Sequence, residues 1–123
     1  MSIASYKDLE VWQFGMELTK DCYFLTRKFP REEMFGVTSQ IRRSAASVPA
    51  NVAEGHGRES TGDFIQFLRI SQGSLKELET HLLLAAKVNI CAASAIEPHL
   101  QQADRIGRML RSLIRRLQER HKR

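Results

Sequence analysis

The sequence predicts an all-α protein, an antiparallel up-and-down four-helix bundle that forms one domain over residues 1–123. Three observations favour this fold. Apolar residues recur three and four positions apart in four long segments, which is the pattern of helices that each bury one side. The longest breaks between segments, near 55–60 and 88–94, span about six residues, and short connections place consecutive helices antiparallel. With 42% hydrophobic residues among 123, the chain is long enough to bury one core.

The first helix is expected from about Asp8 to Lys28 and the second from about Glu32 to Glu54. Pro30 separates them, because the residue before a proline leaves the helical region. The seam of the first helix comprises Val11, Gly15, Leu18, Cys22, Leu25 and Phe29. The seam of the second comprises Val37, Ile41, Ala45, Val48 and Val52.

Pro49 lies in the interior of the second helix. It cannot donate a hydrogen bond to the carbonyl of Ala45, and its ring pushes against the preceding turn, so a bend is predicted there. Ser44, Ser47 or a water could satisfy the freed carbonyl. After the bend, glycine in the left-handed conformation is expected to end the helix. We therefore assign structural roles to Pro49, Gly55 and Gly57.

The third helix opens at Ser60 or Thr61, and Asn89 is a suitable stop. The fourth opens at Ser94, with Glu97 as its capping-box partner and Pro98 in the first turn. The seam of the third helix comprises Phe64, Leu68, Ser71, Leu75, Leu78, Leu82 and Ala85. The seam of the fourth comprises Leu100, Ala103, Gly107, Leu110, Ile114 and Leu117.

The first and third helices carry more apolar residues than one bundle seam needs. This surplus predicts an exposed apolar patch and therefore a homo-oligomer, the alternative being a monomer with a wide core. The residues assigned to the oligomer interface are Trp12, Met16, Tyr23, Phe67 and Ile70.

The net charge of +5 is concentrated in the fourth helix. Residues 101–123 carry eight basic and two acidic residues, whereas residues 1–100 are nearly neutral. At about 100° per residue the arginines fall outside the apolar arc and form an exposed stripe, which Lys122 and Arg123 extend. Arginine matches phosphate oxygens, so the stripe predicts a polyanionic partner. The assigned nucleic-acid-binding residues are Arg105, Arg108, Arg111, Arg115, Arg116 and Arg120.

Two other interpretations of the basic helix stay open. It can be a soluble, arginine-rich terminal helix without a ligand. It can also form intersubunit ion pairs with Glu10, Glu17 or Glu77.

No pattern in the sequence predicts a catalytic residue, a metal site or a cofactor. The four histidines lack metal-ligand spacing with a cysteine or with each other, and no phosphate-binding glycine motif occurs. The best catalytic candidates, Glu54, His56 and Arg58, are spaced two apart, which does not gather them on one helix face. Together these side chains could serve phosphodiester chemistry, so a nuclease is a third hypothesis, but a helix end and turn is the simpler interpretation of that segment.

The predicted location is the cytoplasm, without a membrane partner. No apolar run is long enough to span a bilayer, and the N-terminus lacks the features of a signal peptide. Cys22 and Cys91 lie far apart among apolar residues, which favours reduced core cysteines over a disulfide.

Four segments carry a family resemblance: YKDLEVWQFGMELTKDCY (6–23), SQIRRSAASVPANVAEGHGR (39–58), FIQFLRISQGSLKELETHLLLA (64–85) and IGRMLRSLIRRL (106–117). They resemble the four-helix bundle proteins encoded in intervening sequences of bacterial 23S ribosomal RNA genes. The central motif, IRR-x-A-x-S-x-PANxAEG-x-GR, matches from Ile41 to Arg58.

The resemblance implies an up-and-down four-helix bundle without established enzymatic activity. That family is similar to the accessory protein of diversity-generating retroelements, a basic pentameric barrel that associates with reverse transcriptase and nucleic acid. A homopentamer is the assembly that this implies. The leading hypothesis is a non-enzymatic oligomer that binds RNA or DNA through the fourth helix. The alternative is an oligomeric scaffold for a protein partner, such as a nucleic-acid enzyme, with no direct nucleic-acid binding.

Overall fold

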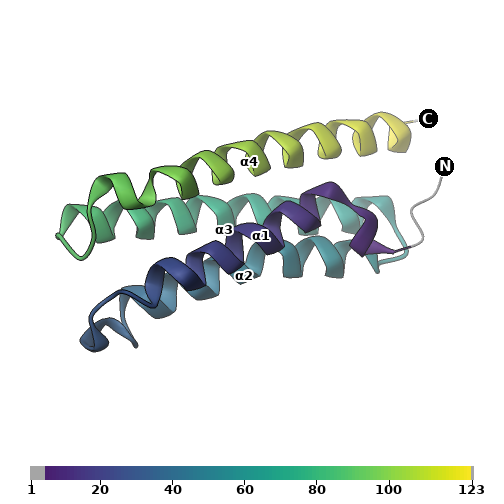
Figure 1. Cartoon of the computed structure of the whole chain (residues 1–123). Coiled ribbons are helices and arrows are strands. Elements are labelled where there is room, and N and C mark those ends of the chain that lie inside the picture. The colour runs from purple at the N-terminus through teal and green to yellow at the C-terminus, as the bar shows by residue number, and fades with distance from the viewer. Residues whose placement is uncertain (1–4, 123) are drawn as a thin grey trace.

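The computed structural model describes residues 5–122 and shows four long helices with no strand in that range (Figure 1). The helices are α1 (Glu10–Thr26), α2 (Val37–His56), α3 (Thr61–Lys87) and α4 (Ala93–Lys122). Short 3-10 turns, η1 (Tyr6–Asp8) and η2 (Arg31–Glu33), precede α1 and α2. Each long helix packs against its neighbours in the order α1–α2–α3–α4, and α4 also packs against α1. The all-helical, four-helix fold is as predicted.

The core follows the predicted seams closely. Fully buried side chains come from all four helices, and the seam positions of α2 are buried except Val37, which is half-buried. The largest of them are Leu18, Ile41, Leu68, Leu75, Leu78, Leu82, Ile96, Ile106 and Leu110. The seam of α3 begins at Ile65 instead of Phe64, which is only partly buried against the core.

The contact between α1 and α2 centres on Pro49. A Cβ atom on Gly15 would lie 3.3 Å from both Cβ and Cδ of Pro49, so α1 supplies a glycine where the proline ring approaches it. The Thr19 hydroxyl donates to the carbonyl oxygen of Ala45 at 3.1 Å and to that of Gly15 at 2.8 Å. The carbonyl that Pro49 frees is therefore satisfied by α1, and Ser44 and Ser47 are not used for it. The bend at Pro49 stays a prediction.

The contact between α2 and α3 is tight and partly polar. Ser71 donates to the carbonyl oxygen of Val48 at 2.8 Å, and the hydroxyls of Ser47 and Ser74 lie 2.8 Å apart. Each of these serine hydroxyls has a hydrogen-bond partner on the other helix, so the two backbones can approach without burying an unpaired polar group.

The predicted left-handed glycine at the end of α2 is wrong. No glycine among residues 5–122 has a positive φ, and Gly57 caps the helix with φ −77°. Gly55 instead lies inside α2 and is buried. A Cβ atom there would lie 2.6 Å from Cβ of Phe67, which is closer than Cβ atoms approach in proteins. Gly55 is therefore required by the proximity of α3 and not by its own backbone conformation.

Two helix starts also differ from the expectation. α2 begins at Val37 instead of Glu32, because η2 and Gly36 take up the preceding residues. α4 begins at Ala93, so Ser94 lies within the helix instead of capping it, and Pro98 lies beyond its first turn.

The end of α3 is as expected. Asn89 adopts the left-handed conformation with φ 65°. Backbone bonds from Asn89 to Ala86 and from Ile90 to Ala85 complete a Schellman motif.

Both cysteines are free thiols, Cys22 in the core and Cys91 half-buried. Burial, with a smaller contribution from the charge of Asp21, raises the pKa of the Cys22 thiol to about 12. Of the helices within residues 5–122, none has the length and apolarity to cross a membrane.

Candidate nucleic-acid interface

The candidate interface is the outer surface of α4, whose inner surface packs in the core. Ala103, Ile106 and Leu110 are buried along the helix. The arginines turn away from them, as the 3.6-residue period predicts. All six are exposed: Arg105, Arg108, Arg111, Arg115, Arg116 and Arg120. The side chains of Lys122 and Arg123, expected to extend this surface, lie outside the described residues.

Two of these arginines have partners within the chain. Arg108 forms an ion pair with Asp104 at 3.3 Å, and both side chains are largely exposed. Such a pair contributes roughly 0–1 kcal/mol and exchanges readily for another anion. The Arg105 guanidinium lies 4.3 Å from the ring centroid of Phe14 on α1, which fixes its position and leaves its charge unneutralised.

The other four arginines have no carboxylate within 4.0 Å among the described residues. They are Arg111, Arg115, Arg116 and Arg120. Unneutralised guanidiniums on one helix over several turns produce a field that attracts phosphates.

The arginines form a broad band instead of one narrow stripe. Arg111 lines a hollow between α3 and α4, together with Lys76 and Glu79. Arg116 lines a separate hollow between α4 and the start of α1, together with Asp8 and Glu10. The band therefore extends toward both neighbours of α4.

The acidic residues considered as intersubunit partners for α4 are largely engaged. Glu17 pairs with Lys20 at 2.8 Å, and Glu77 pairs with Arg43 at 2.6 Å. Glu10 lies in the hollow beside Arg116. Both pairs are exposed and contribute roughly 0–1 kcal/mol each, so intersubunit ion pairing and binding of an external anion both stay open for the arginines.

The residues weighed as a catalytic group contact one another or neighbouring aromatic rings. Glu54 and Arg58 form an ion pair at 2.9 Å, and Arg58 also lies 4.8 Å from the ring centroid of Phe67. His56 packs edge-on against Phe64, with ring centroids 5.8 Å apart. Within residues 5–122, no group of three or more His, Cys, Asp or Glu residues could hold a metal ion.

The residues assigned to the oligomer interface differ in exposure. Met16, Tyr23 and Ile70 are each at least 40% exposed. Trp12 is half-buried and contacts the Tyr6 ring edge-on, at 5.3 Å between centroids. Phe67 is half-buried beneath Arg58.

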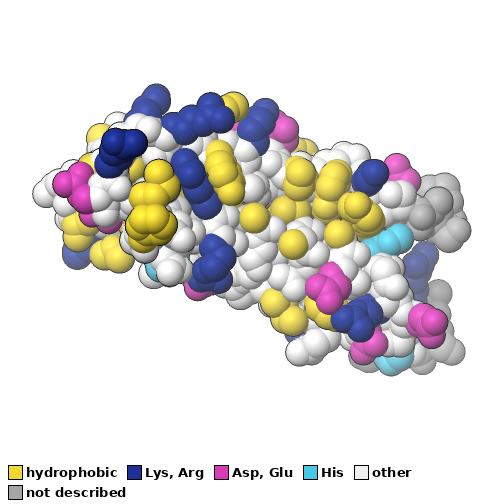
Figure 2. Space-filling view, turned by 90° about the horizontal axis from the view of Figure 1, so that it is seen from below, with side chains coloured by type: hydrophobic (Ala, Val, Ile, Leu, Met, Phe, Trp, Pro, Cys, Tyr) yellow, Lys and Arg dark blue, Asp and Glu magenta, His cyan; other side chains and the backbone are white. Residues whose placement is uncertain are grey.

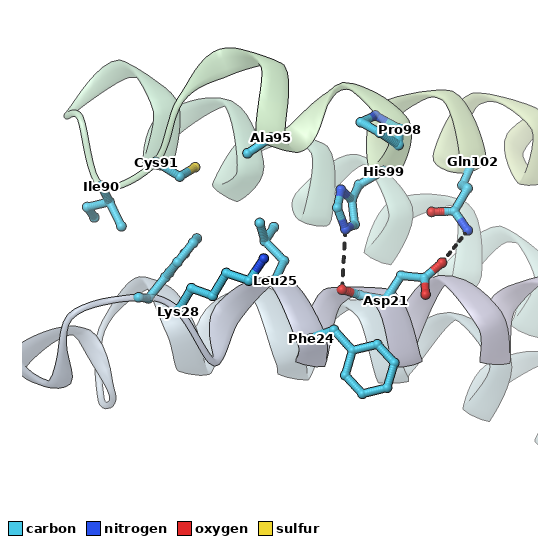
Figure 3. A pocket seen from close by; sticks show the side chains of 11 residues that line it. Asp21, Phe24, Leu25, Lys28, Ile90, Cys91, Ala95, Pro98, His99 and Gln102 are labelled. Atoms are coloured by element: carbon cyan, nitrogen blue, oxygen red, sulfur yellow. Dashed lines mark hydrogen bonds between the residues drawn. The ribbon is translucent and has the colours of Figure 1, made fainter.

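A pocket of about 480 Å³ lies between the end of α1 and the start of α4 (Figure 3). Asp21 is held there by Gln102, whose Nε2 donates to Oδ2 at 2.9 Å, while Nε2 of His99 lies 3.3 Å from the Asp21 carbonyl oxygen. Cys91 also lines the pocket, and burial raises the pKa of its thiol, which keeps it protonated near neutral pH.

Sequence reasoning missed this pocket because Asp21 and His99 are 78 positions apart and belong to no motif. The arrangement places polar groups beside an apolar wall of Leu25, Phe29 and Ile90. The pocket holds the Asp21 carboxylate and the His99 imidazole in place. The pKa of the Cys91 thiol is raised, whereas a nucleophilic thiol needs a lowered pKa.

The geometry thus defines an antiparallel four-helix bundle with a basic outer surface on its last helix. The chain belongs to the family described as 23S rRNA-intervening sequence protein, whose model matches residues 7–112. It is also similar to the crystal structure of a protein with unknown function from the S23 ribosomal protein family of Bacteroides thetaiotaomicron VPI-5482. That similarity has a TM-score of 0.75 and 25% sequence identity, and covers 85% of this chain and 97% of the other. A comparison with curated proteins finds no match.

Proposed function

We propose that this chain is a non-enzymatic, oligomeric four-helix bundle that binds RNA or DNA through the arginines of α4. The observation that carries the proposal is the row of exposed guanidiniums that have no carboxylate partner in the part of the chain that the structure describes. They are Arg111, Arg115, Arg116 and Arg120. Such groups bind phosphate oxygens in a fork geometry and release counterions on binding. No aromatic side chain interrupts α4 between Ala93 and Lys122, so its contacts are with phosphates instead of bases.

The oligomer is supported by the outer face of α2 and its flanks. Ala50 is exposed on α2, while Met16 and Ile70 lie exposed on the neighbouring helices α1 and α3. Figure 2 shows hydrophobic side chains gathered over the underside of the bundle. Small residues flanked by large apolar ones allow a helix of a second copy to approach closely. A homopentamer is the assembly that we favour, on the strength of the family resemblance.

Binding is tested by fluorescence anisotropy with a labelled polynucleotide over a salt series. The variant replaces Arg111, Arg115 and Arg116 with Gln. The control replaces Lys7, Lys20 and Arg58 with Gln, which removes the same charge elsewhere. A plot of log affinity against log salt concentration has a negative slope. In the variant the magnitude of this slope should decrease by about 2–3, whereas in the control it should change far less. Equal effects in both, or no binding by the wild type at low salt, would reject the proposal.

Oligomerisation is tested by light scattering. Ala50→Glu places a charge on the proposed contact and should lower the measured mass, whereas Gln101→Glu, an equally exposed change on α4, should not. A wild-type protein that is monomeric at micromolar concentration would contradict the oligomer.

The alternative function, a scaffold for a protein partner without direct nucleic-acid binding, is favoured by a second apolar surface. Leu83, Leu84 and Val88 are about half exposed at the end of α3. Under this alternative, a Leu84→Glu variant would lose a co-purifying protein while the α4 variant would retain it. Direct binding of purified protein to a polynucleotide would count against it.

A further inference from the structure

A second basic surface lies where α1 ends and α2 begins, at the opposite end of the bundle from the two chain termini (Figure 1). A pocket of about 380 Å³ opens there, within the roughly 300–1,000 Å³ typical of ligand sites. Tyr23, Phe35, Thr38, Arg42 and Arg43 line it, and none of its lining residues is acidic. Figure 2 shows basic and hydrophobic side chains side by side at this end of the molecule.

Arg42 is held in position for an anion. Its guanidinium carbon lies 4.6 Å from the ring centroid of Tyr23, and its Nε donates to the Thr26 hydroxyl at 2.8 Å. Neither contact neutralises its charge, and no carboxylate lies within 4.0 Å among the described residues. A guanidinium fixed in this way loses little conformational freedom when it binds a phosphate.

Arg43 adds a second cation on the next residue. It is bound to Glu77 at 2.6 Å and to Gln40 at 2.9 Å. Arg43 is therefore directed toward α3, whereas Arg42 contacts α1, and because its ion pair is exposed it contributes charge to the rim of the pocket and not a second fixed phosphate ligand.

Phe35 provides an unused aromatic surface. Its side chain is 95% exposed, in the turn between η2 and α2. Both faces of an exposed ring can stack on a planar group, and every nucleobase has such a face.

From these contacts we infer that the pocket binds one nucleotide of single-stranded nucleic acid. The base stacks on Phe35 and the phosphate lies on Arg42, while Arg43 adds positive charge at the rim of the pocket. This inference rests on the proposed nucleic-acid binding and specifies its substrate as single-stranded. In a duplex the bases are already stacked, so the aromatic contact is lost and only phosphate contacts remain.

The test uses Phe35→Leu, which keeps an apolar side chain but removes the ring, and Phe35→Tyr, which keeps the ring. Each protein is titrated with a short labelled single strand, as RNA and as DNA, and with the matching duplex. Loss of one stacked base weakens binding roughly 5- to 100-fold. Phe35→Leu should show that loss for a single strand and little change for the duplex, while Phe35→Tyr should bind like the wild type. Because Phe35 is exposed, all three proteins should remain folded.

The outcomes separate this inference from the function on which it rests. If the α4 substitutions weaken binding but Phe35→Leu does not, the pocket assignment is wrong and the basic helix stands. If Phe35→Leu alone weakens single-strand binding, the pocket stands and the α4 proposal is wrong. If Phe35→Leu lowers the mass in light scattering and leaves single-strand binding unchanged, the pocket is a contact between copies of the chain and the inference is overturned.

Discussion

Gly55→Ala should destabilise the bundle, although alanine is the better helix former. Gly55 lies inside α2, where replacement of glycine by alanine ordinarily gains about 0.5–1 kcal/mol. The new Cβ atom, however, would lie 2.6 Å from Cβ of Phe67 and 3.0 Å from Cδ1 of Phe64. Rotation of the Phe67 side chain does not move its Cβ atom, so α2 and α3 must separate.

The size of the effect follows from these opposing contributions. Overpacking a well-packed contact costs roughly 1–3 kcal/mol. After the gain in helix propensity is subtracted, the expected net loss is about 1 kcal/mol in the free energy of unfolding, in a range of about 0–2.5 kcal/mol. Gly73→Ala is the matched control, because Gly73 lies inside α3 and a Cβ atom there meets nothing within 4 Å. That control should stabilise the protein by about 0.5–1 kcal/mol.

The measurement is urea unfolding followed by far-ultraviolet circular dichroism, at one protein concentration because an oligomer's stability depends on it. The two substitutions should change the midpoint in opposite directions. If Gly55→Ala raises the midpoint as Gly73→Ala does, the close contact between α2 and α3 is not what requires glycine at this position.

Three further predictions concern stability. Thr19→Val leaves the carbonyl freed by Pro49 without its partner and should cost about 1–3 kcal/mol in urea unfolding. Asn89→Ala should lose about 1–2 kcal/mol and Asn89→Gly should not, because φ is 65° there. Burial raises the pKa of Cys22 from 9.0 to about 12, so the unfolded state releases this proton first as the pH rises. Between pH 9.0 and about pH 12 the free energy of unfolding, measured with urea, should therefore fall by up to about 4 kcal/mol. It should fall less steeply in Cys22→Ala.

The core could be predicted from the sequence because helical periodicity depends only on neighbours along the chain. Ile41, Ala45, Val48 and Val52 recur every three or four residues, and all four are fully buried. Capping by Asn89 was equally local. The start of α2 was predicted too early, because Glu32 is a good helix former, yet it lies in a separate 3-10 turn before Gly36.

Contacts between helices could not be derived in this way. The sequence shows that Gly55 is a glycine, but not that Phe67 lies against it. It also shows that Pro49 frees the carbonyl of Ala45, but not that the partner is Thr19, 26 residues earlier. Both depend on how two helices are rotated against each other, which periodicity leaves open.

The same limit applies to the two basic surfaces. Exposure of the α4 arginines follows from the helical period, because all of them lie on one element. The pocket at the other end combines Tyr23, Phe35 and Arg42 from α1, a turn and α2. Only folding places an aromatic ring beside these arginines. The sequence shows that α4 has no aromatic residue, but not that Phe35 lies close to Arg42.

The segment from Ile41 to Arg58 now divides by what its side chains contact. Pro49 packs against Gly15 of α1, and Gly55 admits Phe67 of α3, so these two positions set how closely α2 lies to its neighbours. Arg42 and Arg43, at the start of the same segment, line the pocket, Arg42 half-buried against Tyr23 and Arg43 exposed. Substitutions at the first pair should therefore act on stability, and conservative ones at the second pair mainly on ligand affinity. α2 thus sets the spacing of the bundle and, in the proposed function, presents the charged groups of the second binding surface.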